Sequence, residues 1–356
     1  MNDLANRRGS HSSTRIAGFD ILRGLCAIGV ALRHVTGNLV ENHTGFPGSN
    51  LSLYTVYIFF VLSGASLFVA YSHRLASERD ILNFMANRLL RIVPLYALVL
   101  GFYAIYSFFM HGVSIGYIAE AFLNVTLLFG LGNPGASLLV VGGWSLGIEF
   151  AFYLMFPILS AVTKTRYWWV FLVVLFVAQR IFIELLFRSH GLSSTGWVLY
   201  SQPLSFIGYF FAGCCIGRVA LHRFTSRNVA PYLFALAASL IVLVFYQPPT
   251  DVASLVGPAG IVLTLVSCGA VYFASFLVSP GAWRRLSTIL GDSSYGVYLM
   301  HVPVMFVLKE RISDLPLFIS IPLILGVTIA LAIISNRFFE MPIRRRGKLA
   351  EDLVTV

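Results

Sequence analysis

The sequence predicts an all-α integral membrane protein with about ten transmembrane helices and both termini in the cytoplasm. Of its 356 residues, 58% are hydrophobic and only 11% are charged, and the mean hydropathy is +0.82. Apolar runs long enough to cross a bilayer, about 17–25 residues, recur along the chain. Backbone polar groups in lipid must be paired internally, and unbroken runs of this length fit helices rather than a closed barrel. A soluble protein is therefore excluded, and we expect residues 16–340 to form one membrane domain.

Ten apolar windows are predicted to cross the membrane. An eleventh, residues 114–131, is apolar but carries Glu120 and Asn124. If it crossed, the later basic loops would move outside, against the usual charge distribution. We therefore expect it to lie along the outer interface or to re-enter. The ten windows are residues 16–36, 51–71, 92–110, 144–163, 167–187, 203–221, 229–246, 255–278, 289–309 and 316–338.

The distribution of Lys and Arg orients these spans. With ten spans and a cytoplasmic N-terminus, nineteen basic residues lie inside and only Arg188, Lys309 and Arg311 lie outside. Cytoplasmic loops of membrane proteins carry such an excess. It also accounts for the net charge of +10, so we expect the lipid bilayer and not nucleic acid as a partner. Residues 1–15 are then a basic cytoplasmic N-terminus, and residues 341–356 a cytoplasmic tail.

The first span carries ionisable groups in an apolar segment. Arg23 and His34 are eleven residues apart, so on a helix they lie within about 20° of one face and about 16 Å apart along the axis. A charge near the bilayer centre costs at least about 2.5–3.5 kcal/mol, so such residues usually face a protein interior or a wet cavity. Asp20, one turn earlier, could form a structural ion pair with Arg23, and the two roles can coexist.

A carboxylate is expected at the level of His34. Trp144 begins the fourth span on the outer side, which places Glu149 one to two turns inside it. A histidine with a carboxylate partner is a usable general base, because the carboxylate orients the ring and stabilises its protonated form. The alternative is that His34 lies at the interface and Glu149 pairs with an arginine.

Two further groups have both a functional and a structural interpretation. Arg88 and Arg91 lie on neighbouring parts of one helical face near the cytoplasm, where paired guanidinium groups suit phosphates; they could equally be topology anchors. Ser63, in the middle of the second span, could be a nucleophile or a contact of acyl-CoA, but small polar residues commonly pack and hydrogen-bond between membrane helices.

A polar stripe opens the ninth span. Tyr295, Tyr298 and His301 follow one another at three-residue spacing, and we place them, with Trp144, in the lining of a cavity; for His301 a packing role is the alternative. The four cysteines lack metal-ligand spacing, so no metal site is expected.

Five motifs, in order and spread over about residues 16–340, resemble the acyltransferase-3 family of integral-membrane O-acyltransferases. They are Arg23 with ten residues before His34, the run Phe59-Phe60-Val-Leu-Ser63-Gly64, Arg88-x-x-Arg91 with Pro94, Trp144-Ser-Leu-x-x-Glu149, and Ser294-Tyr295-x-x-Tyr298-Leu-x-His301.

The resemblance implies a multi-pass protein of the plasma (inner) membrane that takes an acyl group, often acetyl, from cytoplasmic acyl-CoA. The acceptor would be a hydroxyl of a sugar or similar molecule, commonly at the periplasmic side. It implies that His34 is the catalytic base, that Arg23 is a partner of the donor or the catalytic centre, and that Arg88 and Arg91 suit the phosphates of the donor. The resemblance implies acyl-CoA, in this family often acetyl-CoA, as the donor substrate, and no covalently bound cofactor is expected.

Direct attack of the acceptor hydroxyl on the thioester is the mechanism we expect, with Arg74 or Arg79 as further contacts of the nucleotide. A covalent intermediate on His34 or Ser63 is the alternative.

A transporter or flippase of a polar or lipid-linked substrate would also use buried Arg, His and Glu, although inverted repeats are not evident. Another type of membrane acyltransferase, acting on lipids or proteins, is a third possibility.

Overall fold

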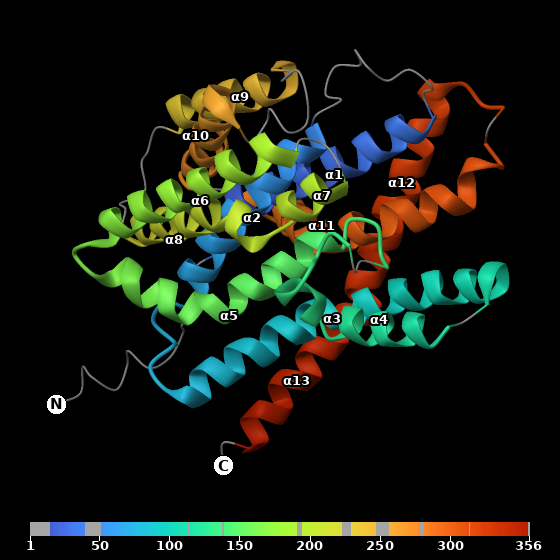
Figure 1. Cartoon of the computed structure of the whole chain (residues 1–356), viewed down its shortest axis with the longest axis horizontal. Coiled ribbons are helices and arrows are strands. Elements are labelled where there is room, and N and C mark those ends of the chain that lie inside the picture. Colours follow the sequence, from blue (N-terminus) through green and yellow to red (C-terminus); the bar gives the residue numbers. More distant parts are fainter. Residues whose placement is uncertain are drawn as a thin grey trace.

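The computed structural model describes residues 15–39, 51–112, 114–136, 139–190, 194–222, 229–246, 256–277, 281–312 and 314–354. Within these ranges the regular structure is helical and there is no strand (Figure 1). The all-α fold class is confirmed. The basic N-terminus predicted for residues 1–15 lies almost entirely outside the described residues.

Each predicted span contains a helix, and within the described ranges six helices are long and apolar enough to cross a membrane. This supports a multi-pass membrane protein, while the count of ten spans and the orientation of the termini stay predictions. The six are α2 (Leu51–Tyr71), α3 (Glu78–His111), α5 (Trp144–Lys164), α6 (Trp168–His190), α10 (Gly257–Ala274) and α12 (Leu317–Ser335).

The other four segments differ from these six in charge or in length. Helix α1 (Ala17–Leu39) is long enough but carries Asp20, Arg23 and Arg33. Helix α11 (Gly281–Lys309) is likewise long and carries several charges. Helices α8 (Ile207–Leu221) and α9 (Ala230–Phe245) have 15 and 16 residues, or about 22–24 Å, which is less than the roughly 30 Å of a bilayer core.

Helix α2 lies at the centre of the bundle. It packs against α1, α5, α8 and α10, and α1 packs in turn against α11 and α12 (Figure 1). At the crossing of α2 and α8, a Cβ on Gly64 would lie 2.0 Å from the carbonyl oxygen of Phe210, and a Cβ on Gly213 would lie 2.0 Å from that of Val61. The two glycines thus let the two backbones touch, as small residues do between membrane helices.

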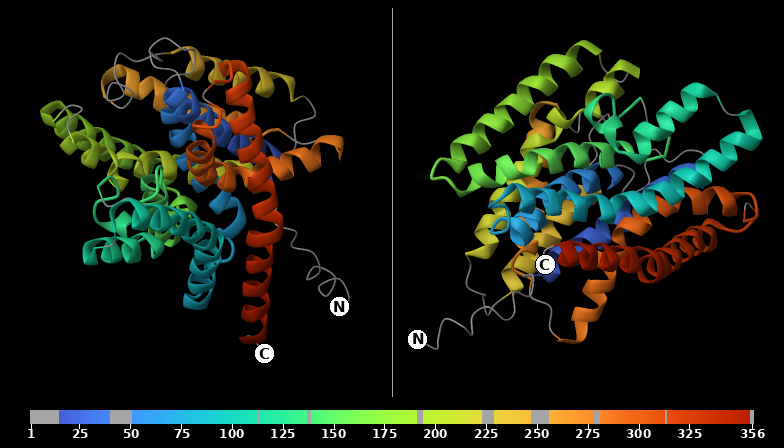
Figure 2. Two further views of the ribbon diagram at one scale, coloured as in Figure 1. Left: turned by 90° about the vertical axis from the view of Figure 1, so that its right-hand side faces the viewer. Right: turned by 90° about the horizontal axis from the view of Figure 1, so that it is seen from below.

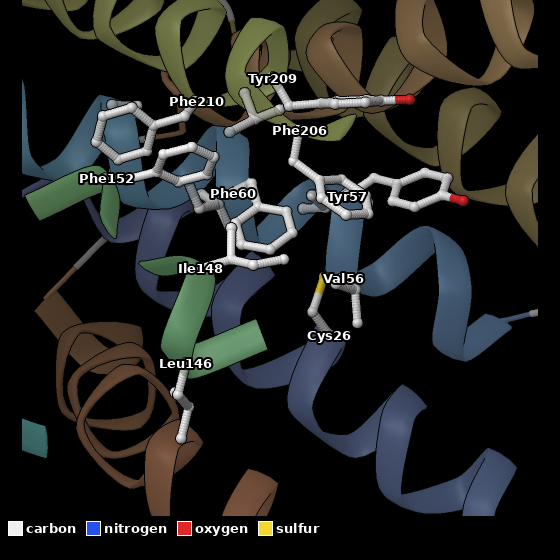
Figure 3. Close-up of a cluster of buried hydrophobic side chains, with 14 of the residues drawn as sticks. Cys26, Val56, Tyr57, Phe60, Leu146, Ile148, Phe152, Phe206, Tyr209 and Phe210 are labelled. Atoms are coloured by element: carbon white, nitrogen blue, oxygen red, sulfur yellow. The ribbon is translucent and has the colours of Figure 1, made fainter. Parts of the chain in front are cut away.

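An aromatic cluster joins α2, α5 and α8 (Figure 3). The rings of Phe152 and Phe210 are stacked with centroids 4.7 Å apart, and Phe60 meets Phe152 edge to face at 5.6 Å. All three side chains are at most 3% exposed. Such pairs add to the stability that burial provides, and they fix α5 beside α2.

The segment between α4 (Ile115–Val125) and α5 folds inward. Helix α4 has 11 residues, or about 16 Å, too short to cross a bilayer, as expected for residues 114–131. After it, Leu127 and Phe129 are buried, and a Cβ on Gly130 would lie 2.0 Å from the carbonyl oxygen of Gly147. Helix α5 therefore begins inside the protein rather than at its surface. Three further short helices are described: η2 (Leu128–Leu131), α7 (Ser194–Tyr200) and η3 (Pro203–Ser205).

The C-terminal helices form one rod. Helix α12 passes through a π-helix, η5 (Asn336–Glu340), into α13 (Met341–Val354), and the left view of Figure 2 shows the three as a continuous helix. Helix α13 packs against α3. Most of the predicted tail, residues 341–356, is thus helical.

Candidate functional site

A cavity of about 340 Å³ lies between α1, α2, α3, α5 and α11. It brings together seven residues that the sequence predicts to act together, although they come from five separate helices. The seven are Arg23, Ser63, Arg88, Arg91, Glu149, Tyr295 and Tyr298. Arg74, which was expected as a further contact, lines it as well, whereas Arg79 is not among the lining residues.

One end of the cavity is strongly cationic. Arg74, Arg88 and Arg91 lie there, and the guanidinium of Arg88 sits 5.0 Å from the ring centre of Tyr71 and donates a 2.8 Å hydrogen bond to its hydroxyl. The Nε atom of Arg88 is buried without a hydrogen-bond partner among the described residues. A buried donor without an acceptor is costly, so this end is prepared for an anionic ligand.

Arg23 lines the cavity from α1. Its Nη2 donates a 2.6 Å hydrogen bond to Ser66 Oγ, and its Nη1 lies 3.6 Å from a carboxylate oxygen of Asp20. Arg23 thus lies near Asp20 and lines the cavity at the same time, while its role toward the donor or the catalytic centre stays a prediction. Among the described residues, the cavity lining contains four guanidinium groups, those of Arg23, Arg74, Arg88 and Arg91, and the carboxylate of Glu149.

Glu149 accepts two hydrogen bonds inside the cavity. Ser63 Oγ donates one at 2.8 Å and the hydroxyl of Tyr153 donates the other at 2.6 Å, both to Oε1. The bond from Ser63 joins α2 to α5, as small polar residues commonly do between membrane helices, and a nucleophilic role for Ser63 stays a prediction. Tyr153 was missed by the sequence analysis, although its position four residues after Glu149 puts it on the same helix face.

His34 pairs with His301, not with Glu149. Nδ1 of His34 and Nε2 of His301 are 2.8 Å apart, and the ring planes are within 18° of parallel. The prediction of a His34–Glu149 pair is wrong because α5 begins inside the protein. Ser145 bonds to Tyr298, which lies one turn before His301, and Glu149 lies one further turn along α5, beside Ser63.

The histidine pair adjoins the other end of the cavity, and His301 does not line it, contrary to its prediction. Tyr298 lines the cavity, meets Phe59 edge to face at 5.9 Å, and has its ring centre 6.2 Å from that of His301. The Tyr298 hydroxyl is fixed by the carbonyl of Gly142 at 2.9 Å and by Ser145 Oγ at 2.7 Å. Phe59 and Tyr298 thus belong to the cavity wall, and Tyr298 connects that wall to His301.

Trp144 does not line the cavity, contrary to its prediction. Its ring lies 5.6 Å from that of Trp197 and 5.4 Å from that of Tyr200, in an aromatic group beside α8. Ser145 lines the cavity instead. Successive helical residues point about 100° apart. Ser145, four residues before Glu149, lies on the same face of α5 as Glu149.

Known proteins resemble the chain over nearly its whole length. A family model described as an acyltransferase domain matches residues 16–337. The O-acetyltransferase OatA of Staphylococcus aureus is 25% identical over 95% of this chain and 58% of its own length. The putative peptidoglycan O-acetyltransferase YrhL of Bacillus subtilis is 28% identical over 93% of this chain and 55% of its own.

A shorter relative matches more completely. The exopolysaccharide production protein ExoZ of Rhizobium meliloti is 27% identical over 82% of this chain and 90% of its own length. The chain thus spans little more than half of OatA and YrhL but most of ExoZ. No solved structure matches it. Together with the five motifs, these matches establish that the chain belongs to the acyltransferase-3 family of integral-membrane O-acyltransferases.

Proposed function

We propose that this protein transfers an acyl group, most simply acetyl, from cytoplasmic acyl-CoA to a hydroxyl of a cell-surface or exported carbohydrate. The observation that carries the proposal is the cavity, which has arginines at one end and the His34–His301 pair beside the other. A donor with a polyanionic nucleotide and a long neutral arm matches this distribution of charge. The names of the relatives, which refer to O-acetylation, peptidoglycan and exopolysaccharide, support a carbohydrate acceptor.

Arg74, Arg88 and Arg91 would bind the phosphates of CoA through charge-assisted hydrogen bonds. The pantetheine arm would then follow the cavity past Arg23 and Glu149, with the thioester next to Phe59 and Tyr298. This order places the reactive end of the donor nearest the histidine pair. In this orientation, the cationic end faces the cytoplasm and His34 faces outward, in the plasma (inner) membrane.

His34 would act as the general base. Its imidazole takes the proton of the acceptor hydroxyl while that oxygen forms a bond to the thioester carbonyl carbon. The carbon–sulfur bond then breaks, and the imidazolium returns its proton to the departing CoA thiolate. General-base help of this kind is typically worth about 10²–10⁴-fold.

The test uses the full-length protein in lipid vesicles with labelled acetyl-CoA and, as acceptors, an exopolysaccharide and peptidoglycan fragments. We expect label on carbohydrate and an equal release of free thiol, both reduced about 10²–10⁴-fold in His34→Ala. His222→Ala is the matched control, because this exposed histidine at the end of α8 lies away from the cavity.

Other outcomes would contradict the proposal. Movement of a substrate across the vesicle membrane without thiol release would identify a transporter. Label on lipid or protein would identify a different acyltransferase. A fully active His34→Ala variant would show that the base is another residue.

A further inference from the structure

The contacts of His34 and His301 indicate which ring nitrogen of each histidine carries the proton. His301 lies in α11 and is 1% exposed, whereas His34 in α1 is only partly buried. Their mutual contact joins Nδ1 of His34 to Nε2 of His301 at 2.8 Å. Between two neutral imidazoles, one of these nitrogens must donate and the other must accept.

The second nitrogen of His301 decides which one donates. Nδ1 of His301 lies 3.3 Å from the carbonyl oxygen of Val297. A carbonyl oxygen can only accept, so the favourable arrangement has the proton of His301 on Nδ1. Nε2 of His301 then carries a lone pair and accepts from Nδ1 of His34. With its own proton on Nδ1, neutral His34 has an unprotonated Nε2.

We propose that His301 is a positioning residue that holds His34 in the tautomer whose Nε2 can take the acceptor's proton. This inference rests on the proposed function of His34 as base. His301 itself is too buried to meet a carbohydrate. The role is the one that a carboxylate fills in many catalytic dyads, where the partner of one ring nitrogen determines the state of the other. When Nε2 takes the proton, the Nδ1–H bond to His301 is retained and the ring stays in place.

Two substitutions of His301 separate this role from packing. In His301→Leu the imidazole acceptor is lost, which leaves the His34 ring with the backbone carbonyl of Val30 as a partner, so the ring and its tautomer are less firmly held. We expect kcat to fall by about 10²-fold, the scale of a small misplacement of a reacting group. KM for acetyl-CoA should be unchanged, because the arginines lie at the far end of the cavity. In His301→Gln the amide oxygen can accept from His34 while the amide nitrogen donates to Val297, so most of kcat should return.

The tautomer of His34 can be measured directly, and it would not change if His301 only filled space in the protein. Nitrogen NMR of histidine-labelled protein in lipid should show His34 protonated at Nδ1 in the wild type and in His301→Gln, and a mixture in His301→Leu. The signal is assigned with His34→Gln.

Three results would overturn the proposal. Equal loss of activity in the Leu and Gln variants would indicate that His301 itself takes a proton. Full activity in both would show that His34 needs no partner. A wild-type His34 protonated at Nε2 would contradict the hydrogen-bond assignment directly. None of these bears on whether His34→Ala abolishes transfer, so failure of this inference is distinguishable from failure of the proposed function.

Discussion

Ser63 and Glu149 are 86 positions apart in the chain, yet Ser63 Oγ donates a 2.8 Å hydrogen bond to a carboxylate oxygen of Glu149. The bond joins α2 to α5 inside the cavity, where Tyr153 donates to the same oxygen. A serine that donates to a carboxylate has two possible uses. It can fix the position of the carboxylate, or the carboxylate can activate it as a nucleophile.

Substitution of Ser63 separates these uses. We expect Ser63→Ala to retain transfer within about 10²-fold, because direct transfer needs no serine and the lost bond to a charged group is worth about 1.5–3 kcal/mol. Ser63→Thr, which keeps the hydroxyl, is the control. The measurement is the transfer rate from labelled acetyl-CoA, together with a search for label on acid-quenched protein. A dead Ser63→Ala with labelled wild-type protein would establish an acyl-Ser63 intermediate instead.

The double substitution Arg88→Gln/Arg91→Gln should weaken binding of CoA. Two charge-assisted contacts to phosphate are lost, and raised salt should reproduce part of the effect in the wild type through screening. Arg284→Gln/Arg285→Gln is the matched control, since these two exposed arginines of α11 do not line the cavity. Affinity is measured by titration of CoA into the purified protein. If both double variants bind CoA as the wild type does, Arg88 and Arg91 only anchor the topology.

Reporter fusions test the predicted orientation. Fusions after Asn133 and after Arg166 should report outside and inside, respectively, because nineteen of the assigned basic residues then lie in the cytoplasm and three outside. A reporter active only in the cytoplasm and one active only outside give complementary readings. The reverse pattern would place the cationic end of the cavity on the outer side and remove the access of cytoplasmic acyl-CoA.

Gly64→Ala should destabilise the contact of α2 with α8. The added methyl group would lie 2.0 Å from the carbonyl oxygen of Phe210, and overpacking of this kind costs about 1–3 kcal/mol. The control is Gly101→Ala in α3, where a Cβ meets nothing within 4 Å. Thermal unfolding in detergent should show a lower midpoint for Gly64→Ala only. Equal midpoints would mean that the two helices can separate without loss.

Much of the site follows from helical periodicity and local sequence. Arg23, Arg88 and Arg91 were predicted from charges placed in or beside apolar segments, and each lines the cavity. Charges in apolar segments are informative because an unpaired charge in lipid is costly, so a charged residue there indicates a polar interior.

The partners could not be predicted in the same way. The level of Glu149 depends on the inward fold of the segment before α5, and periodicity gives no information about where a helix begins in depth. The partner of His34 depends on how α1 packs against α11. Trp144 was wrongly predicted to line the cavity because neighbouring residues in a motif point to different faces of a helix.

The Phe59–Tyr298 pair has a consequence for how the reaction is driven. On the proposed mechanism CoA stays at the cationic end, and only the acyl carbons need to pass the two rings, whose centres are 5.9 Å apart. The acyl group would thus reach the far side of the membrane while still joined to sulfur, with the free energy of the thioester unspent. Modification outside the cell would then require no nucleotide or ion gradient there. Because the two rings meet edge to face, a ring would have to turn aside for the acyl group, and a short acyl chain would need the smallest displacement.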